Sequence, residues 1–126
     1  MSQRLRYNLN ATTEFGLLKD DISAAGREVV LNVQGSASGV VTAPTGGAGT
    51  VLTLSVTTLG WLWLRNIDDS AVPNFVTWGV DSAGSLVPVG RLKPSEDAWF
   101  RLEPGVTIRL RADTLQVPVQ YKVLND

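Results

Sequence analysis

The chain has 126 residues, a length that suits one domain and lets it bury roughly two-thirds of the surface exposed by the unfolded chain. It contains no Cys and no His, which removes the thiol nucleophile, the commonest general base and most transition-metal ligands. Eleven Lys and Arg against twelve Asp and Glu give a formal net charge of −1. We therefore expect neither nucleic-acid binding nor attachment to a membrane surface.

Neither a secretory leader nor a membrane span is predicted. Residues 1–6 lack the apolar core of a signal peptide, and the longest unbroken apolar run, residues 61–64, is far shorter than the about twenty residues that span a bilayer. We expect a soluble protein, and the absence of Cys fits a reducing compartment such as the cytoplasm.

Apolar and polar residues alternate with a period of two through most of the chain, which is typical of β-strands with one buried face. The strands expected from this pattern are, in chain order, residues 5–9, 29–33, 38–43, 52–56, 60–67, 74–80, 86–92, 98–102, 107–112 and 116–124. Gly, Pro, Asp and Ser mark turns between them. The only candidate for a helical turn lies within residues 16–26, whose Asp20-Asp21-Ile22-Ser23 segment is a poor helix former.

About ten short strands at spacings of about ten residues predict a sandwich, a jelly roll or a small barrel. The chain shows no internal repeat and no linker. The predicted fold is all-β: a single-domain antiparallel β-sandwich of jelly-roll type that spans residues 1–126. Within it, residues 1–28 could form an arm or a peripheral strand.

One hairpin can be predicted in register, between the two strands that flank Pro104-Gly105. Phe100 then lies opposite Leu110 on the buried side, and Trp99 lies opposite Arg111 on the outer side, within reach of a cation–π contact. A shorter loop would slip the register by one residue and place apolar side chains opposite charged ones. The alternative is that a jelly roll places these two strands in different sheets.

A glycine-rich segment, Gly46-Gly47-Ala48-Gly49-Thr50, resembles a phosphate-binding loop in composition only. No Lys precedes its Thr, and it leads into an expected strand rather than into a helix whose N-terminus could hold a phosphate. We therefore interpret residues 46–49 as a flexible hairpin loop.

Acidic residues are the only other candidates for metal binding or catalysis: Asp68, Asp69, Asp81, Glu96 and Asp97. They lie beside Gly, Pro or Ser in expected turns, where Asp bonds its own backbone, and no calcium-loop motif is present. No Ser lies in a nucleophile-elbow motif, and no His is present to activate one. The sequence predicts no enzyme, no catalytic residue, no metal and no cofactor.

The four Trp residues allow three interpretations. Trp61 and Trp63 share one face of an expected strand, while Trp78 and Trp99 lie in later strands. Packing in the core and between sheets is the simplest interpretation. Anchoring of a subunit interface is the second, because Trp is enriched there, and a platform for stacking carbohydrate is the third.

A long central stretch, residues 29–64, contains no charged residue although 18% of the chain is charged. Its outward positions are Asn32, Gln34, Ser36, Thr42, Thr53, Ser55 and Thr57. Exposed strands usually carry charge, which prevents their edges from pairing with other chains. The stretch is therefore either covered by another subunit or built into central strands that are covered on both faces.

The residues predicted to make subunit contacts are Trp61, Trp63, Thr53, Ser55, Trp99, Arg101, Arg109 and Arg111. Three of them, Arg101, Arg109 and Arg111, are expected to form a second, basic face. Arg outnumbers Lys in this chain, which is consistent with ordered contacts at interfaces.

The C-terminal half carries a series of strand ends and turns. Leu64-Arg65-Asn66-Ile67-Asp68 ends one expected strand, Asn74-Phe75-Val76-Thr77-Trp78 begins the next, and Leu92-Lys93-Pro94-Ser95-Glu96 forms a turn. This series resembles small all-β structural proteins of tailed bacteriophages, in which a strand end like Arg-Asn-Ile-Asp precedes a turn like Leu-x-Pro-Gly-Glu. The resemblance covers residues 60–126, and Ser95 stands where that turn has Gly.

The resemblance implies a jelly-roll subunit of the virion, assembled in the host cytoplasm, that acts by assembly and uses no catalytic residue. A head decoration (cement) protein is the leading expectation: a homo-oligomer, for example a trimer, bound to the major capsid protein or to other virion subunits. A tail, neck or fibre-base component and a carbohydrate-binding module for host attachment are the alternatives. Cupins share the strand-and-turn rhythm, but their metal-binding His residues have no counterpart here.

Overall fold

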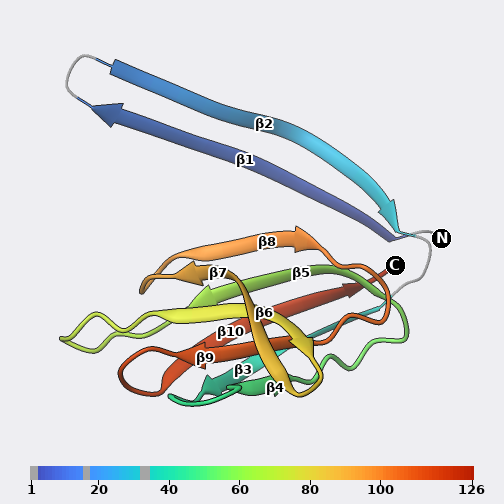
Figure 1. The fold of residues 1–126 in the computed structure, drawn as a ribbon. Coiled ribbons are helices and arrows are strands. Elements are labelled where there is room, and N and C mark those ends of the chain that lie inside the picture. The colour runs from blue at the N-terminus through green and yellow to red at the C-terminus, as the bar shows by residue number, and fades with distance from the viewer. Residues whose placement is uncertain (1–2, 16–17, 32–34) are drawn as a thin grey trace. The chain divides into compact units, whose positions relative to one another are not determined.

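The computed structural model describes residues 3–15, 18–31 and 35–126, and every regular element in these ranges is a β-strand (Figure 1). Consequently, no helix in these ranges is long and apolar enough to cross a membrane. The chain divides into two compact units, Met1–Gln34 and Gly35–Asp126, which are described separately below.

The first unit is a two-stranded antiparallel hairpin. Strand β1 (Gln3–Phe15) pairs with β2 (Leu18–Leu31), with a bulge between Tyr7 and Leu9. The candidate for a helical turn, within residues 16–26, belongs to strand β2 from residue 18 onward, which agrees with its poor helix-forming sequence. Asn32 and Gln34 of the uncharged stretch lie outside the described residues.

The second unit is an antiparallel β-sandwich of two four-stranded sheets, which confirms the predicted all-β sandwich. Sheet I has the order β3-β10-β5-β8, and sheet II has the order β4-β9-β6-β7. The strands are β3 (Ser36–Ala43), β4 (Thr50–Leu52), β5 (Leu59–Asn66), β6 (Val76–Ser82), β7 (Ser85–Leu92), β8 (Asp97–Arg101), β9 (Ile108–Ala112) and β10 (Val117–Asn125).

The core lies between the inner faces of the two sheets. Leu62 and Leu64 of sheet I and Ile108 and Leu110 of sheet II are almost completely buried there. An aromatic stack joins the two layers, because the ring of Trp78 in sheet II lies 4.4 Å from that of Phe100 in sheet I, at an interplanar angle of 8°. Trp78 therefore packs between the sheets, as the simplest interpretation of the tryptophans predicts.

The predicted hairpin between residues 98–102 and 107–112 is wrong, and the alternative of two different sheets is correct. Strand β8 pairs with β5 in sheet I, whereas β9 lies between β4 and β6 in sheet II. Phe100 and Leu110 do both face the core, but from opposite layers. Alternation specifies which side of a strand is buried, and it leaves the neighbouring strand undetermined.

The strand expected at residues 52–56 ends early. Strand β4 pairs only along Ile108–Leu110 of β9, and residues 53–58 then leave sheet II to reach β5 in sheet I. Their period-two pattern therefore continues beyond the strand itself: Leu54 and Val56 are half-buried against the core, and Thr53 and Ser55 are exposed.

The turn between β7 and β8 contains a backbone conformation that favours glycine. Ser95 has a φ of +70°, and Glu96 N donates to Lys93 O at 3.0 Å. Pro94 at the second position and a positive φ at the third are the features of a type II turn, which normally places Gly at the third position. A left-handed conformation costs a residue other than Gly about 1–2 kcal/mol.

Replacing this serine by glycine is therefore expected to stabilise the fold. We predict that Ser95→Gly raises the free energy of unfolding by about 1 kcal/mol, because the relief of strain exceeds the extra entropy that Gly gives the unfolded chain. Urea unfolding measures the change. The matched control is Ser85→Gly, an exposed serine with an ordinary φ, where the same replacement lowers stability. A Ser95→Gly variant less stable than the parent contradicts this interpretation.

Candidate functional site

Three of the four Trp residues lie on the outer face of sheet I. Because Leu62 and Leu64 of β5 point into the core, Trp61 and Trp63 project from the other side of the strand. Trp99 of β8 lies opposite Trp63 in the register, so it projects from the same face. We call Trp61, Trp63 and Trp99 the tryptophan face; all three are half-buried, and the simplest interpretation, core packing, is wrong for them.

Contacts within the tryptophan face hold its rings in place. Trp61 and Trp99 stack with centroids 5.4 Å apart and an interplanar angle of 19°. The indole Nε1 of Trp63 donates a hydrogen bond of 3.0 Å to Asp97 Oδ2 at an exposed position. The face therefore offers ordered aromatic surface rather than loose side chains.

Charged side chains border the tryptophan face. Arg101 lies opposite Trp61 in the register and pairs with Asp126, and Lys122 of β10 lies opposite Trp63. The surface thus combines Trp with Arg, the residue types that are enriched at the energetic centres of protein interfaces.

The predicted basic face of Arg101, Arg109 and Arg111 is wrong. Arg101 lies on the outside of sheet I, whereas Arg109 and Arg111 lie on the outside of sheet II, because β8 and β9 belong to different sheets. The predicted cation–π contact of Trp99 with Arg111 is wrong for the same reason. Arg91, whose guanidinium lies 4.1 Å from the centroid of the Phe75 ring, makes such a contact instead.

The glycine-rich loop accepts hydrogen bonds from both arginines of β9. Arg111 Nη1 donates to the carbonyl of Gly47 at 3.1 Å, and Arg109 contacts the carbonyl of Ala48 at 3.4 Å and pairs with Asp81. The loop connects β3 of sheet I to β4 of sheet II, so the expectation of a hairpin loop is wrong. Gly49 is required there, because a Cβ on it would lie 2.2 Å from the carbonyl oxygen of Leu110.

The acidic candidates are dispersed. Asp81 pairs with Arg109, Asp97 accepts the indole of Trp63, and Glu96 Oε2 accepts the backbone N–H of Lys93 at 2.7 Å. Among the residues whose side chains the structure describes, 4–6, 8 and 35–126, no three Asp, Glu, His or Cys side chains lie close enough together to hold a metal ion. Their observed partners are those of structural turn and ion-pair residues.

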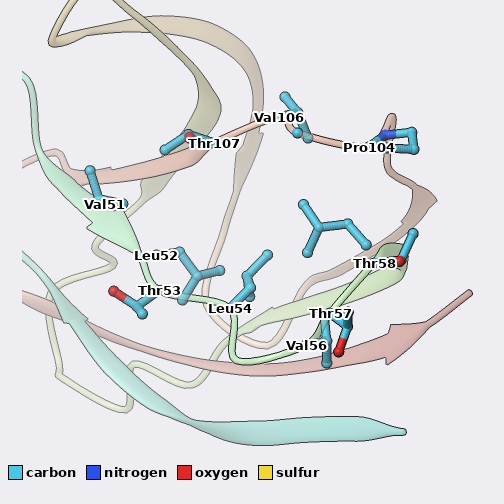
Figure 2. A pocket seen from close by; sticks show the side chains of 12 residues that line it. Val51, Leu52, Thr53, Leu54, Val56, Thr57, Thr58, Pro104, Val106 and Thr107 are labelled. Atoms are coloured by element: carbon cyan, nitrogen blue, oxygen red, sulfur yellow. The ribbon is translucent and has the colours of Figure 1, made fainter. Parts of the chain in front are cut away.

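An open hollow lies at one end of the sandwich, between residues 51–59 and residues 104–107 (Figure 2). It has a volume of about 500 Å³ and is lined by apolar side chains, such as those of Leu54 and Val106, and by threonine hydroxyls. None of its lining residues is charged. The hollow therefore lacks groups for acid–base chemistry and offers only apolar contact and hydroxyl hydrogen bonds.

Two buried asparagines that no sequence motif marks as functional hold the loops at the end of the sandwich where β5 ends. Asn66 Nδ2 donates to the carbonyls of Asn74 at 2.9 Å and Leu92 at 3.1 Å. Asn74 Nδ2 donates to the carbonyl of Leu115 at 2.7 Å, and its Oδ1 accepts the N–H groups of Thr114 and Leu115. These bonds explain the Arg-Asn-Ile-Asp strand end as a structural clamp.

Two of the strands in the uncharged stretch are edge strands of the sandwich rather than central strands. Strand β3 is an edge of sheet I, and β4 is an edge of sheet II; among the strands in residues 35–64, only β5 is an inner strand. The interpretation of doubly covered central strands is thus wrong for β3 and β4. The predicted outward positions Ser36, Thr42, Thr53, Ser55 and Thr57 are all exposed.

Comparison of the chain with protein-family models, with curated proteins and with solved structures finds no match.

The asparagine clamp yields a stability prediction. In Asn66→Asp the shape is kept, but the side chain loses both donors and places a carboxylate against two buried carbonyls. We expect a loss of about 3 kcal/mol or more in the free energy of unfolding, measured by urea denaturation. Gln116→Glu makes the same amide-to-acid change at an exposed position and is expected to stay within about 0.5 kcal/mol of the parent. Equal stability of the two variants would show that the clamp is dispensable.

Proposed function

We propose that this protein is a non-enzymatic subunit that works by assembly, as a decoration (cement) protein on the head of a tailed phage. The observation that carries the proposal is the tryptophan face: three indoles on the outside of a sheet, bordered by Arg and Lys. Outward aromatic surface of this kind is typical of interface anchors. The phage assignment rests on the resemblance of residues 60–126.

The mechanism of such a subunit is the addition of buried area. A cement protein attaches across joints between capsid subunits and adds contacts where the capsid's own contacts must resist internal DNA pressure. Stable attachment requires an interface on the order of 1,000 Å² or more. On the outer surface of sheet I, the stacked Trp61 and Trp99 supply a rigid contact area, so little side-chain entropy is lost on binding.

The rest of the described sandwich, residues 35–126, also favours assembly over catalysis. The hollow contains no titratable side chain, and each of Asp81, Glu96 and Asp97 has a structural partner. A tail, neck or fibre-base subunit would use the same tryptophan face and differs only in the partner, so locating the protein in images of the particle separates these roles.

One observation favours a second candidate, a carbohydrate-binding module. The Trp63 ring lies at the surface beside a carboxylate, and an indole next to polar groups is the arrangement on which sugar rings stack. In that role, host glycans or oligosaccharides released from them would change the tryptophan fluorescence of the protein, and empty phage heads would not.

Binding to empty phage heads tests the leading role. We predict that the protein co-sediments with empty heads of the phage that encodes it, and that Trp63→Asp lowers the affinity at least tenfold by placing a charge in the centre of the contact. The control is Val89→Asp, which adds the same charge at a 60% exposed valine of sheet II. Circular dichroism confirms that both variants are folded.

Two results would refute the proposal. One is the absence of binding to heads by the unmodified chain, and the other is equal binding by the Trp63→Asp and Val89→Asp variants. A fluorescence response to the oligosaccharides together with no binding to heads would favour the carbohydrate role.

A further inference from the structure

The four edges of the sandwich differ in how they are protected. Strand β7 carries Pro88 and Arg91, and its pairing with β6 is interrupted by a bulge. Strand β8 carries Asp97 and Arg101, and β4 has only three residues. Each of these devices is one by which natural sheets prevent pairing with other chains.

Strand β3 has none of these devices. It runs for eight residues, Ser36–Ala43, and contains no charge and no Pro. It pairs with β10 in one unbroken register, and its outward side chains are exposed, with Val40 60% exposed. A long, regular and uncharged edge is a template for another strand.

The backbone groups on the free edge can be assigned. The N–H of Asn125 in β10 donates to the carbonyl of Gly35 at 2.9 Å, so Gly35 faces β10. In an antiparallel ladder the direction alternates, so the odd-numbered residues of β3 bond to β10. The N–H and C=O groups of the even-numbered residues, Ser36, Ser38, Val40 and Thr42, therefore point away from the sheet.

These edge groups are complementary to those of a second copy. An antiparallel pairing centred on Gly39 places Ser36 opposite Thr42 of the copy and Ser38 opposite Val40. This register keeps outward side chains opposite outward ones and forms about eight hydrogen bonds between the chains. Pairing a strand with itself brings like charges together if it carries any, and β3 carries none.

The segment without charged residues extends beyond β3. Strand β3 lies next to β9, which also pairs with β4, so the open edges of both sheets are on one side of the sandwich (Figure 1). The loop that joins β3 to β4 has no charged residue of its own, although Arg109 and Arg111 of β9 donate to its carbonyls. A copy that pairs with β3 meets no charged residue within Ser36–Leu52.

We propose that β3 is a self-association edge, at which two copies of this chain pair antiparallel and join their sheets I into one eight-stranded sheet. The contact is isologous, so it produces a dimer or an assembly of dimers rather than a trimer. It uses the edge of sheet I and not the tryptophan face. The inference does not depend on the proposed role in the virion.

Light scattering and sedimentation velocity of the full chain test the proposal. We expect the parent chain to have the mass of a dimer or of a multiple of a dimer. In Val40→Lys we expect the dissociation constant of the dimer to rise at least tenfold, which shifts the protein toward the monomer. The control is Gln120→Lys, which adds the same charge on the same face one strand further in, opposite Val40 in the register. Val40→Pro removes the outward N–H and is expected to dissociate the dimer without added charge.

Cross-linking tests the register. The chain has no Cys, so Ser38→Cys combined with Val40→Cys gives two thiols that face each other across the two-fold axis at disulfide distance. Oxidation is expected to give a covalent dimer on a non-reducing gel. The control, Gln120→Cys combined with Lys122→Cys, uses the partners of these residues on β10 and is expected to remain monomeric on the gel.

Two outcomes would overturn the inference: a parent chain that is monomeric at high concentration, and a dimer that Val40→Lys leaves unchanged. If the parent is monomeric and Val40→Lys abolishes its binding to phage heads, the edge pairs with a strand of another protein. A monomer that binds heads normally refutes the self-association edge and leaves the proposed function standing; a β3 dimer that does not bind heads does the reverse.

Discussion

The structure depends on one constraint: each strand has two faces, and the packing of the two sheets uses one of them. Once Leu62 and Leu64 of β5 are buried against sheet II, the residues between them must point outward. That is how two tryptophans come to lie outside the core, and β8 then adds Trp99 beside them. The largest side chains of sheet I therefore lie on its outer face. Their remaining exposed apolar surface is unfavourable in water, and burying it against another surface would be favourable.

The sequence was sufficient to predict properties that depend on single strands. Most of the expected strands are present within a few residues, and the buried sides of β8 and β9 were assigned correctly. Properties that depend on the order of strands were not predictable in this way. The hairpin of β8 with β9 and the basic face of Arg101, Arg109 and Arg111 both assumed neighbours that lie in opposite layers.

The candidate site divides in the same manner. Trp61 and Trp63 were expected to share a face, and they do. Which face of β5 is buried is decided by the side on which sheet II packs, and sheet II packs against Leu62 and Leu64. The missed residues are Asn66 and Asn74, because Asn near a turn usually indicates the turn itself. Their burial becomes visible only when the loops they hold are placed around them.

The exposed edge of β3 also affects how the chain behaves before it assembles. An edge that can accept one strand can also accept strands of unfolded or newly made chains, and repeated addition of this kind is how fibrils start. Two-fold pairing occupies both free edges at once, and the outer strands of the joined sheet are then copies of β8, which carry charge. Growth by strand addition would stop there, so correct pairing would also keep concentrated protein from aggregating.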